Sequence, residues 1–161
     1  KRDQTIRLFR TGSGLAADRE TLFWFNLLEI PPKPTKKAVG DDNKLQLAFR
    51  TRIKMFYRPA ELTMPIEQAI TNLTFSKKGN QLVIKNVSPY YITFRKLELR
   101  ASKDSPIVAN LSKINNKMIA PFAELNLPVN ANGPINNTTQ VFYSVINDQG
   151  GETPGTQKLV Q

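Results

Sequence analysis

Residues 44–57 read KLQLAFRTRIKMFY and run directly into Arg58 and Pro59. Counted with the period of two that a β-strand imposes, this segment has one mainly apolar face and one basic face. The first face holds Leu45, Leu47, Phe49, Thr51, Ile53, Met55 and Tyr57, and the second holds Lys44, Gln46, Ala48, Arg50, Arg52, Lys54 and Phe56. At about 3.3 Å per residue the segment would span roughly 45 Å, against a usual strand of about 5–6 residues. We predict a strand that outruns its own domain, although alternation alone favours the more ordinary alternative, a half-buried strand that pairs within the chain.

The composition removes most familiar catalytic constellations. Of the 161 residues 40% are hydrophobic, which is enough to bury a core, and the chain contains no Cys and no His. Disulfides, thiolate nucleophiles, the common zinc sites and imidazole acid–base chemistry are therefore excluded. We expect a protein that is not an enzyme and that needs no catalytic residue, no metal and no cofactor.

The chain carries 23 Lys and Arg against 13 Asp and Glu, a formal charge of +10. This excess favours anionic partners such as nucleic acid, an anionic membrane or an acidic protein surface. One alternative is a basic nucleic-acid-binding β module, in which Phe49, Phe56 and Tyr57 stack on bases between the cations. Strand alternation produces the same interleaving, and no RNP-like or GXXG motif accompanies it, so we expect no nucleic-acid partner.

No apolar run reaches the roughly 18 residues of a membrane span, and the start KRDQTIRLF lacks the apolar region of a signal peptide. We expect no stable membrane insertion. If the protein is exported, its signal would precede residue 1.

Short apolar runs separated by turn residues recur along the chain, whereas the helical period is scarce. We therefore predict an all-β fold. The predicted strands are residues 4–10, 21–30, 44–57, 68–76, 81–86, 91–101, 124–127, 139–146 and 157–160. Turn signals at Gly79, Gly133 and Gly150 support this division.

The segment RPAELTMP, residues 58–65, separates two parts of different character. Residues 62–161 hold enough strands for an immunoglobulin-like sandwich. Residues 1–61 hold three predicted strands, too few to close a two-layer sandwich. We expect two domains, 1–61 and 62–161, of which the first is incomplete in this sequence: it pairs with another chain, or its earlier strands precede residue 1.

The segment DRETLFWFNLLEIPPKP, residues 18–34, contains a nearly unbroken apolar run from 22 to 28. Taken alone, such a run predicts a central strand buried on both faces. Asn26 lies inside the run, and we assign it a structural hydrogen-bonding role because a buried amide needs partners.

Five motifs in order, DRETLFWFNLLEIPPKP, LQLAFRTRIKMFYRP, NVSPYYITF, MIAPFAEL and INDQGG, resemble the periplasmic pilus chaperones of the PapD-like family. The resemblance implies two immunoglobulin-like domains set at an angle around a cleft. It also implies that the chaperone lends an edge strand to an incomplete pilin subunit, the donor-strand complementation that is a known example of strand addition. The implied partners are pilin subunits and an outer-membrane usher, and the implied compartment is the periplasm. The exposed edge strand would also allow self-association, and a structural or adhesive immunoglobulin-like protein without a client stays an alternative.

Carried onto this chain, the resemblance makes Leu45, Leu47, Phe49 and Ile53 the side chains that enter the subunit's groove. Lys54 would hold the subunit's terminal carboxylate, since a carboxylate taken into a cleft must keep charge-assisted hydrogen bonds. Its partner in the family is an arginine on the first strand, which this sequence does not contain.

The resemblance also implies a salt-bridge network between the domains. Its members would be Glu20, Arg58 and Asp148, and its contribution would be orientation more than stability, given what desolvation costs an ion pair. The short loop at residues 31–43 resembles the short-loop branch of the family, associated with rod-like or thin composite pili.

Overall fold

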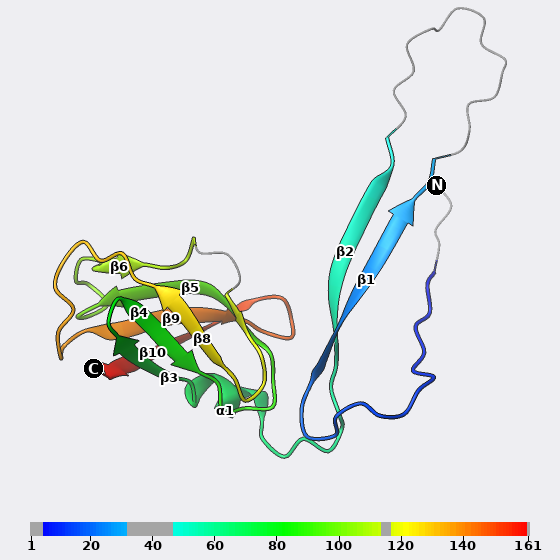
Figure 1. Ribbon diagram of the computed structural model, residues 1–161, viewed down its shortest axis with the longest axis horizontal. Helices are drawn as coiled ribbons and strands as arrows, with labels where there is room; N and C mark the ends of the chain where they lie inside the picture. Colours follow the sequence, from blue (N-terminus) through cyan, green and yellow to red (C-terminus); the bar gives the residue numbers. More distant parts are fainter. Residues whose placement is uncertain (1–4, 32–46, 114–116, 161) are drawn as a thin grey trace, which may run out of the picture. The chain divides into compact units, whose positions relative to one another are not determined.

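A computed structural model describes residues 5–31, 47–113 and 117–160. In this part of the chain nearly all regular structure is β, and the all-β prediction is confirmed (Figure 1). The strands are β1 (Thr21–Glu29), β2 (Phe49–Tyr57), β3 (Thr74–Lys78), β4 (Gln81–Lys85), β5 (Ile92–Arg100), β6 (Ala109–Asn110), β7 (Met118–Ile119), β8 (Glu124–Pro128), β9 (Gln140–Ile146) and β10 (Glu152–Val160), and the helix is α1 (Ile66–Thr71). The chain divides into two compact units, which we call the hairpin unit, Thr21–Arg58, and the sandwich unit, Lys1–Glu20 with Pro59–Gln161.

The hairpin unit is an antiparallel pair of nine-residue strands, β1 and β2. The register runs without a shift from Thr21 opposite Tyr57 to Glu29 opposite Phe49. Because residues directly opposite each other in an antiparallel pair share a face, this register sorts the side chains. The apolar face holds Phe23, Phe25 and Leu27 beside Thr51, Ile53 and Met55, whereas the basic face holds Trp24, Asn26 and Leu28 beside Arg50, Arg52 and Lys54.

The sandwich unit has two layers that share β10. In one layer β5 pairs with β6, β7 and β9, and β9 pairs antiparallel with residues 152–158 of β10. The last residues of β10 turn to the other layer, where Leu159 and Val160 pair in parallel with β3. β4 and β8 complete that second layer (Figure 1).

Three aromatic rings form the centre of the sandwich core. The ring centres of Phe75 on β3 and Tyr143 on β9 are 5.1 Å apart. The ring centre of Phe94 on β5 lies 6.3 Å from that of Phe75 and 5.9 Å from that of Tyr143. The Tyr143 hydroxyl donates a hydrogen bond of 3.0 Å to the carbonyl of Ile70, which joins α1 to the core. Burial raises the pKa of Tyr143. These contacts cross from one layer to the other and hold the sandwich together.

The strand predicted at 68–76 is wrong in its first half, because residues 66–71 form α1 and the strand begins only at Thr74. Pro65 stands at the N-cap, where its fixed φ suits the start of a helix. Ala69 and Ile70 then turn toward the core. A short apolar run with β-branched residues fits either structure, and tertiary burial decided between them.

The other differences concern strand ends and burial. The described residues 5–10 form no strand, and β2 begins at Phe49, with residues 44–46 outside the described part. β10 begins five residues before the predicted 157–160, while the short strands β6 and β7 were not predicted. β1 is not buried on both faces, and Asn26 is exposed, its amide donating only a long 3.5 Å bond to the carbonyl of Trp24.

No helix in the described ranges is long and apolar enough to cross a membrane.

Candidate functional site

β2 has an open edge. One edge of this strand pairs with β1, and no described strand pairs with the other. The unpaired N–H and C=O groups of an open edge can pair with a strand of another chain. β2 therefore offers an edge on which a partner strand can be added, and in this two-stranded sheet the outer edge of β1 is likewise unpaired by any described strand.

Three of the four predicted groove side chains lie in the described part of the chain, and all three are exposed. Leu47 is 56% exposed, Phe49 60% and Ile53 52%. Phe49 and Ile53 share the apolar face, and Leu47 precedes the strand by two residues. Leu45 lies outside the described residues. Large apolar side chains exposed at alternate positions beside an open edge form a surface that a partner can bury.

Lys54 lies on the basic face, directly opposite Trp24. Its ammonium lies 5.6 Å from the centre of the indole ring, and the guanidinium of Arg52 lies 3.9 Å from the same centre. Both distances are within the range of cation–π attraction. Sequence reasoning singled out Lys54 but missed Trp24 and Arg52, because the offset between β1 and β2 that brings them together is visible only in the strand pairing.

Glu20 immediately precedes β1 and is bound to the sandwich unit, to which it belongs. Glu20 is 4% exposed, and its carboxylate accepts a 2.7 Å hydrogen bond from the backbone N–H of Tyr91. Its own N–H donates to the carbonyl of Pro89 at 2.9 Å. Arg58 directly follows β2, and Asp148 lies in the turn between β9 and β10. The predicted network among Glu20, Arg58 and Asp148 stays a prediction.

The loop that receives Glu20 is held by Asn86. The Asn86 amide donates to the carbonyls of Tyr90 and Ala120 at 2.7 and 2.9 Å, and its oxygen accepts from the N–H and hydroxyl of Ser88 at 3.0 and 2.6 Å. Asn86 is 1% exposed. This arrangement gives the motif NVSPYYITF a physical role, since one buried side chain fixes the bend between β4 and β5.

The segment before Glu20 also rests on the sandwich unit. The guanidinium of Arg19 lies 4.9 Å from the ring centre of Phe122, a residue with a φ of 53°. Arg19 also donates two hydrogen bonds to Asp18, which lower the pKa of that carboxyl. A positive φ is unusual for a residue as bulky as Phe122. Its ring lies within cation–π range of the Arg19 guanidinium.

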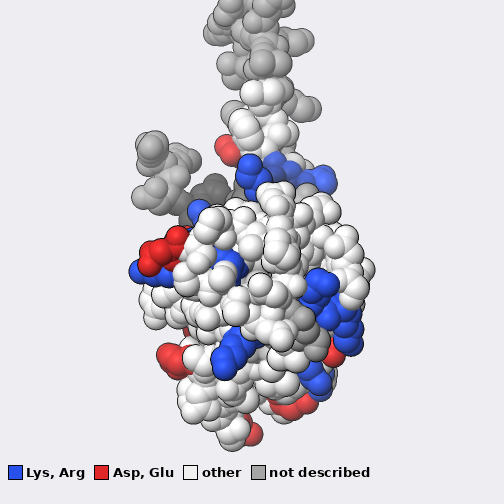
Figure 2. Space-filling model, turned by 90° about the vertical axis from the view of Figure 1, so that its left-hand side faces the viewer, with Lys and Arg blue, Asp and Glu red and all other residues white. Residues whose placement is uncertain are grey.

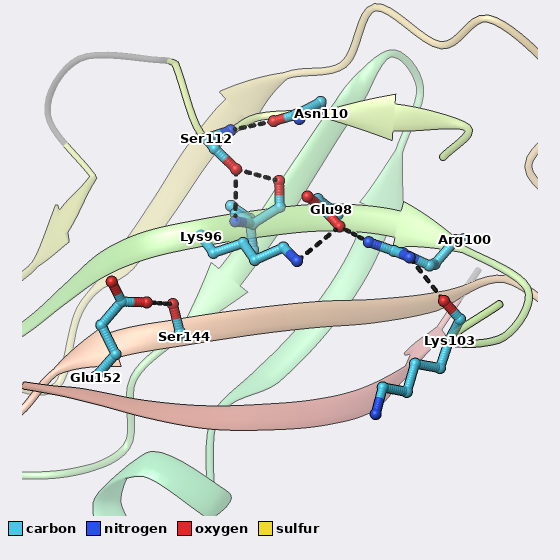
Figure 3. A network of polar contacts seen from close by, with 9 residues as sticks. Lys96, Glu98, Arg100, Lys103, Asn110, Ser112, Ser144 and Glu152 are labelled. Carbon is cyan, nitrogen blue, oxygen red and sulfur yellow. Dashed lines mark hydrogen bonds and ion pairs between the residues drawn. The ribbon is translucent and has the colours of Figure 1, made fainter. Parts of the chain in front are cut away.

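A polar network covers the outer side of β5 (Figure 3). The buried carboxylate of Glu98 forms ion pairs with Arg100 and Lys96, and Arg100 donates to the carbonyl of Lys103 at 2.8 Å. The Arg100 guanidinium also lies 5.3 Å from the ring centre of Phe142. Lys96, Glu98 and Arg100 lie at alternate positions of β5 and pair along that strand, while the buried Nε of Arg100 has no hydrogen-bond partner among the described residues. We interpret the network as structural.

Within the described ranges no group of three or more acidic, Cys or His residues could hold a metal ion. What the hairpin unit can do chemically is to add a strand, to bury alternating apolar side chains and to bind an anion on its basic face.

Comparisons with known proteins agree on one family. The model of the pili and flagellar-assembly chaperone PapD N-terminal domain matches residues 1–63, and that of the pili-assembly chaperone PapD C-terminal domain matches residues 68–157. The probable fimbrial chaperone YadV of Escherichia coli K12 is 42% identical over 99% of this chain and 64% of its own length. The chaperone protein FimC of the same strain is 35% identical over 96% of this chain and 58% of its own length.

Solved structures give the same result. The crystal structure of the YadV chaperone is 38% identical, with a TM-score of 0.72, over 92% of this chain and 67% of that one. A chain of the Salmonella enterica complex of the SafA pilin with the SafB chaperone is 26% identical, with a TM-score of 0.68, over 94% of this chain and 65% of its own length. The chain spans about three fifths of the length of the curated relatives named above. It belongs to the PapD family of pilus-assembly chaperones.

Proposed function

We propose that this protein is a periplasmic chaperone that captures pilin subunits by lending them β2. It completes the fold of each subunit, prevents premature polymerisation and delivers the subunit to an outer-membrane usher. The observation that carries the proposal is the open edge of β2 with the exposed side chains of Leu47, Phe49 and Ile53 beside it. Family membership supports the same reading, as does the likeness to a chain from a solved chaperone–pilin complex.

The energy available for capture follows from these exposures. Full burial of a large apolar side chain stabilises by about 1.5–3 kcal/mol. Phe49 and Leu47 have somewhat more than half of their surface left to bury, so together they offer roughly 2–3.5 kcal/mol. In affinity this is about 30- to 300-fold, in addition to the main-chain hydrogen bonds of the added strand. Leu45 is proposed to add to the same contact.

Two further assignments belong to the proposal. Lys54 anchors the terminal carboxylate of the subunit, and Glu20, Arg58 and Asp148 orient the two domains. We place the domains at 1–61 and 62–161, and the separate family matches to residues 1–63 and 68–157 support this division.

The experiment is capture of a fimbrial subunit by a variant with Leu47→Glu and Phe49→Glu. Charges in the groove should abolish co-purification of the co-expressed subunit, because a carboxylate is costly to bury without a partner. A matched control carries Ile107→Glu and Ile146→Glu, two changes at exposed apolar residues of the sandwich unit. Thermal unfolding shows whether both variants stay folded. Equal recovery of subunit with both variants would refute the donor-strand role.

A further inference from the structure

The positive charge of the chain is concentrated in its first part. Residues 1–58 hold 13 of the 23 cations but only 6 of the 13 acids. On the face of the sandwich unit shown in Figure 2, Lys and Arg side chains lie in several groups, some of them beside Asp or Glu, with uncharged areas between the groups. The excess charge therefore belongs mostly to the part of the sequence that contains the hairpin unit.

Within the hairpin unit the cations share one face. Arg50, Arg52 and Lys54 occupy every second position of β2, and the residues directly opposite them on β1 are uncharged. In the described part of the chain, no ion pair involves Arg50 or Arg52. A row of like charges costs repulsion in the free protein, so an anionic partner on this face gains from relieving it.

Trp24 organises part of this row. Its ring carries the guanidinium of Arg52 at 3.9 Å and the ammonium of Lys54 at 5.6 Å. A long side chain held against an aromatic face has less rotamer freedom to lose when it binds a partner. Arg52 keeps a planar fork of donors that suits a carboxylate.

We infer that the basic face of β2 selects client strands that carry carboxylates at alternate positions. This inference rests on the proposed function, because the client strand reaches this face only if it pairs with the open edge of β2. An added strand lies about 4.8 Å away, and its side chains then stand about 4.5–5.5 Å from those directly opposite. Two acidic residues separated by one residue would face Arg50 and Arg52, while the client residue between them lies on the apolar face.

The same arrangement fixes the register of the client. A slip by one residue would move the acids to the apolar face, and a slip by two would leave one of Arg50 and Arg52 without its partner. The apolar side chains already oppose a slip by one, which would turn the client's apolar residues to the basic face. They distinguish a slip by two poorly, since any large apolar residue can occupy their contacts. Against a slip by two, the charges therefore supply the discrimination.

An acidic strand fits this face better than a nucleic acid does. Base stacking needs an uncovered aromatic face. On the basic face the ring of Trp24 already has Arg52 and Lys54 against it. Phe56, 40% exposed, is the one other aromatic residue of β1 and β2 on that face. This face therefore offers no row of stacking platforms. A carboxylate needs only the donors of the cations and leaves the ring contacts intact.

The test uses three synthetic peptides of equal length in which Val and Leu alternate with Glu, with Gln or with Lys. Because Trp24 is the only tryptophan of the chain, its fluorescence reports binding near the basic face directly. Two opposite-charge pairs across strands should make the Glu peptide bind roughly 2- to 30-fold more tightly than the Gln peptide at low salt. The Lys peptide should bind most weakly, and added salt should remove the preference.

A variant with Arg50→Gln and Arg52→Gln should lose the preference for Glu over Gln. The control variant, with Lys77→Gln and Lys78→Gln in β3, also loses two positive charges, but in the sandwich unit, and it should keep the preference for Glu over Gln. Equal affinity of the unmodified protein for the Glu and Gln peptides would overturn the inference. A second result would also overturn the inference: the unmodified protein binds an oligothymidylate, and the variant with Arg50→Gln and Arg52→Gln does not. The basic face would then accept polyanions of any kind.

The peptides also separate this inference from the proposed function. If the Glu and Gln peptides bind equally and Leu47→Glu with Phe49→Glu abolishes both, strand addition stands and only the charge selection fails. If no peptide binds at any salt concentration, both fail.

Discussion

Replacing Asn86 by Ala removes a side chain that holds together the loop to which Glu20 is bound. Asn86 is 1% exposed, and its amide donates to the carbonyls of Tyr90 and Ala120 while its oxygen accepts two hydrogen bonds from Ser88. Each such bond contributes about 0.5–1.5 kcal/mol net. For four bonds the loss is roughly 2–6 kcal/mol, a large part of the about 5–15 kcal/mol by which a domain is typically stable.

The measurement is urea unfolding followed by far-ultraviolet circular dichroism, with the slope of the transition checked for equality between variants. The control is Ser102→Ala, which removes one exposed hydrogen bond to Ser105 and should change the free energy of unfolding by less than about 0.5 kcal/mol. A loss below about 1 kcal/mol for Asn86→Ala would refute the reasoning. The network would then not be what holds the bend between β4 and β5.

Three further changes test the core and the anchor. Gly155→Ala should lower the free energy of unfolding in urea by about 1–3 kcal/mol, because the new Cβ would lie 2.3 Å from the ring of Tyr143. Gly133→Ala is the control: a Cβ at Gly133 would have no atom within 4 Å, so this change should be neutral. Because burial raises the pKa of Tyr143, the unfolded chain, with the ordinary tyrosine pKa of 10.0, releases this proton at a lower pH than the folded chain does. Above that pH the free energy of unfolding should therefore decrease with rising pH more steeply in the unmodified protein than in Tyr143→Phe. Parallel plots of unfolding free energy against pH for the two proteins would contradict this. Lys54→Ala should weaken subunit capture about 10- to 150-fold in a titration, and amidation of the subunit's C-terminus should remove the difference; the anchor assignment fails if it does not.

Much of the sandwich unit could be predicted from its sequence. β4, β5, β8 and β9 begin and end within a residue of the predicted strands. These segments combine apolar alternation with turn residues such as Gly79 and Gly150, both of which have a positive φ. Local pattern and tertiary burial agree there. They disagree at residues 66–71, where a short apolar run fits a strand and the core takes it as a helix.

The hairpin unit shows where such prediction ends. The apolar run from 22 to 28 indicated a strand that is buried on both faces. The sequence does not say which segment, of this chain or of another, packs against those faces. In the described structure Trp24 and Leu28 on this strand are exposed. The contact of Trp24 with Arg52 also depends on the offset between β1 and β2, which neither strand encodes by itself. The roles of the predicted groove residues and of Lys54 were inferred from the family resemblance and stay predictions, since alternation alone favoured a strand paired within the chain.

In the proposed mechanism the two faces of β2 separate affinity from selection. The apolar face, with Phe49 and Ile53, offers burial whose energy depends on area and hardly on the identity of the apolar residue that covers it. The basic face offers charges whose energy changes sign with the charge of the residue opposite. Salt should therefore weaken discrimination between clients much more than it weakens capture itself. A chaperone must release every subunit that it captures. Exposed ion pairs that water and salt screen contribute little to the free energy of binding, so selection by such pairs adds little to the free energy that release must overcome.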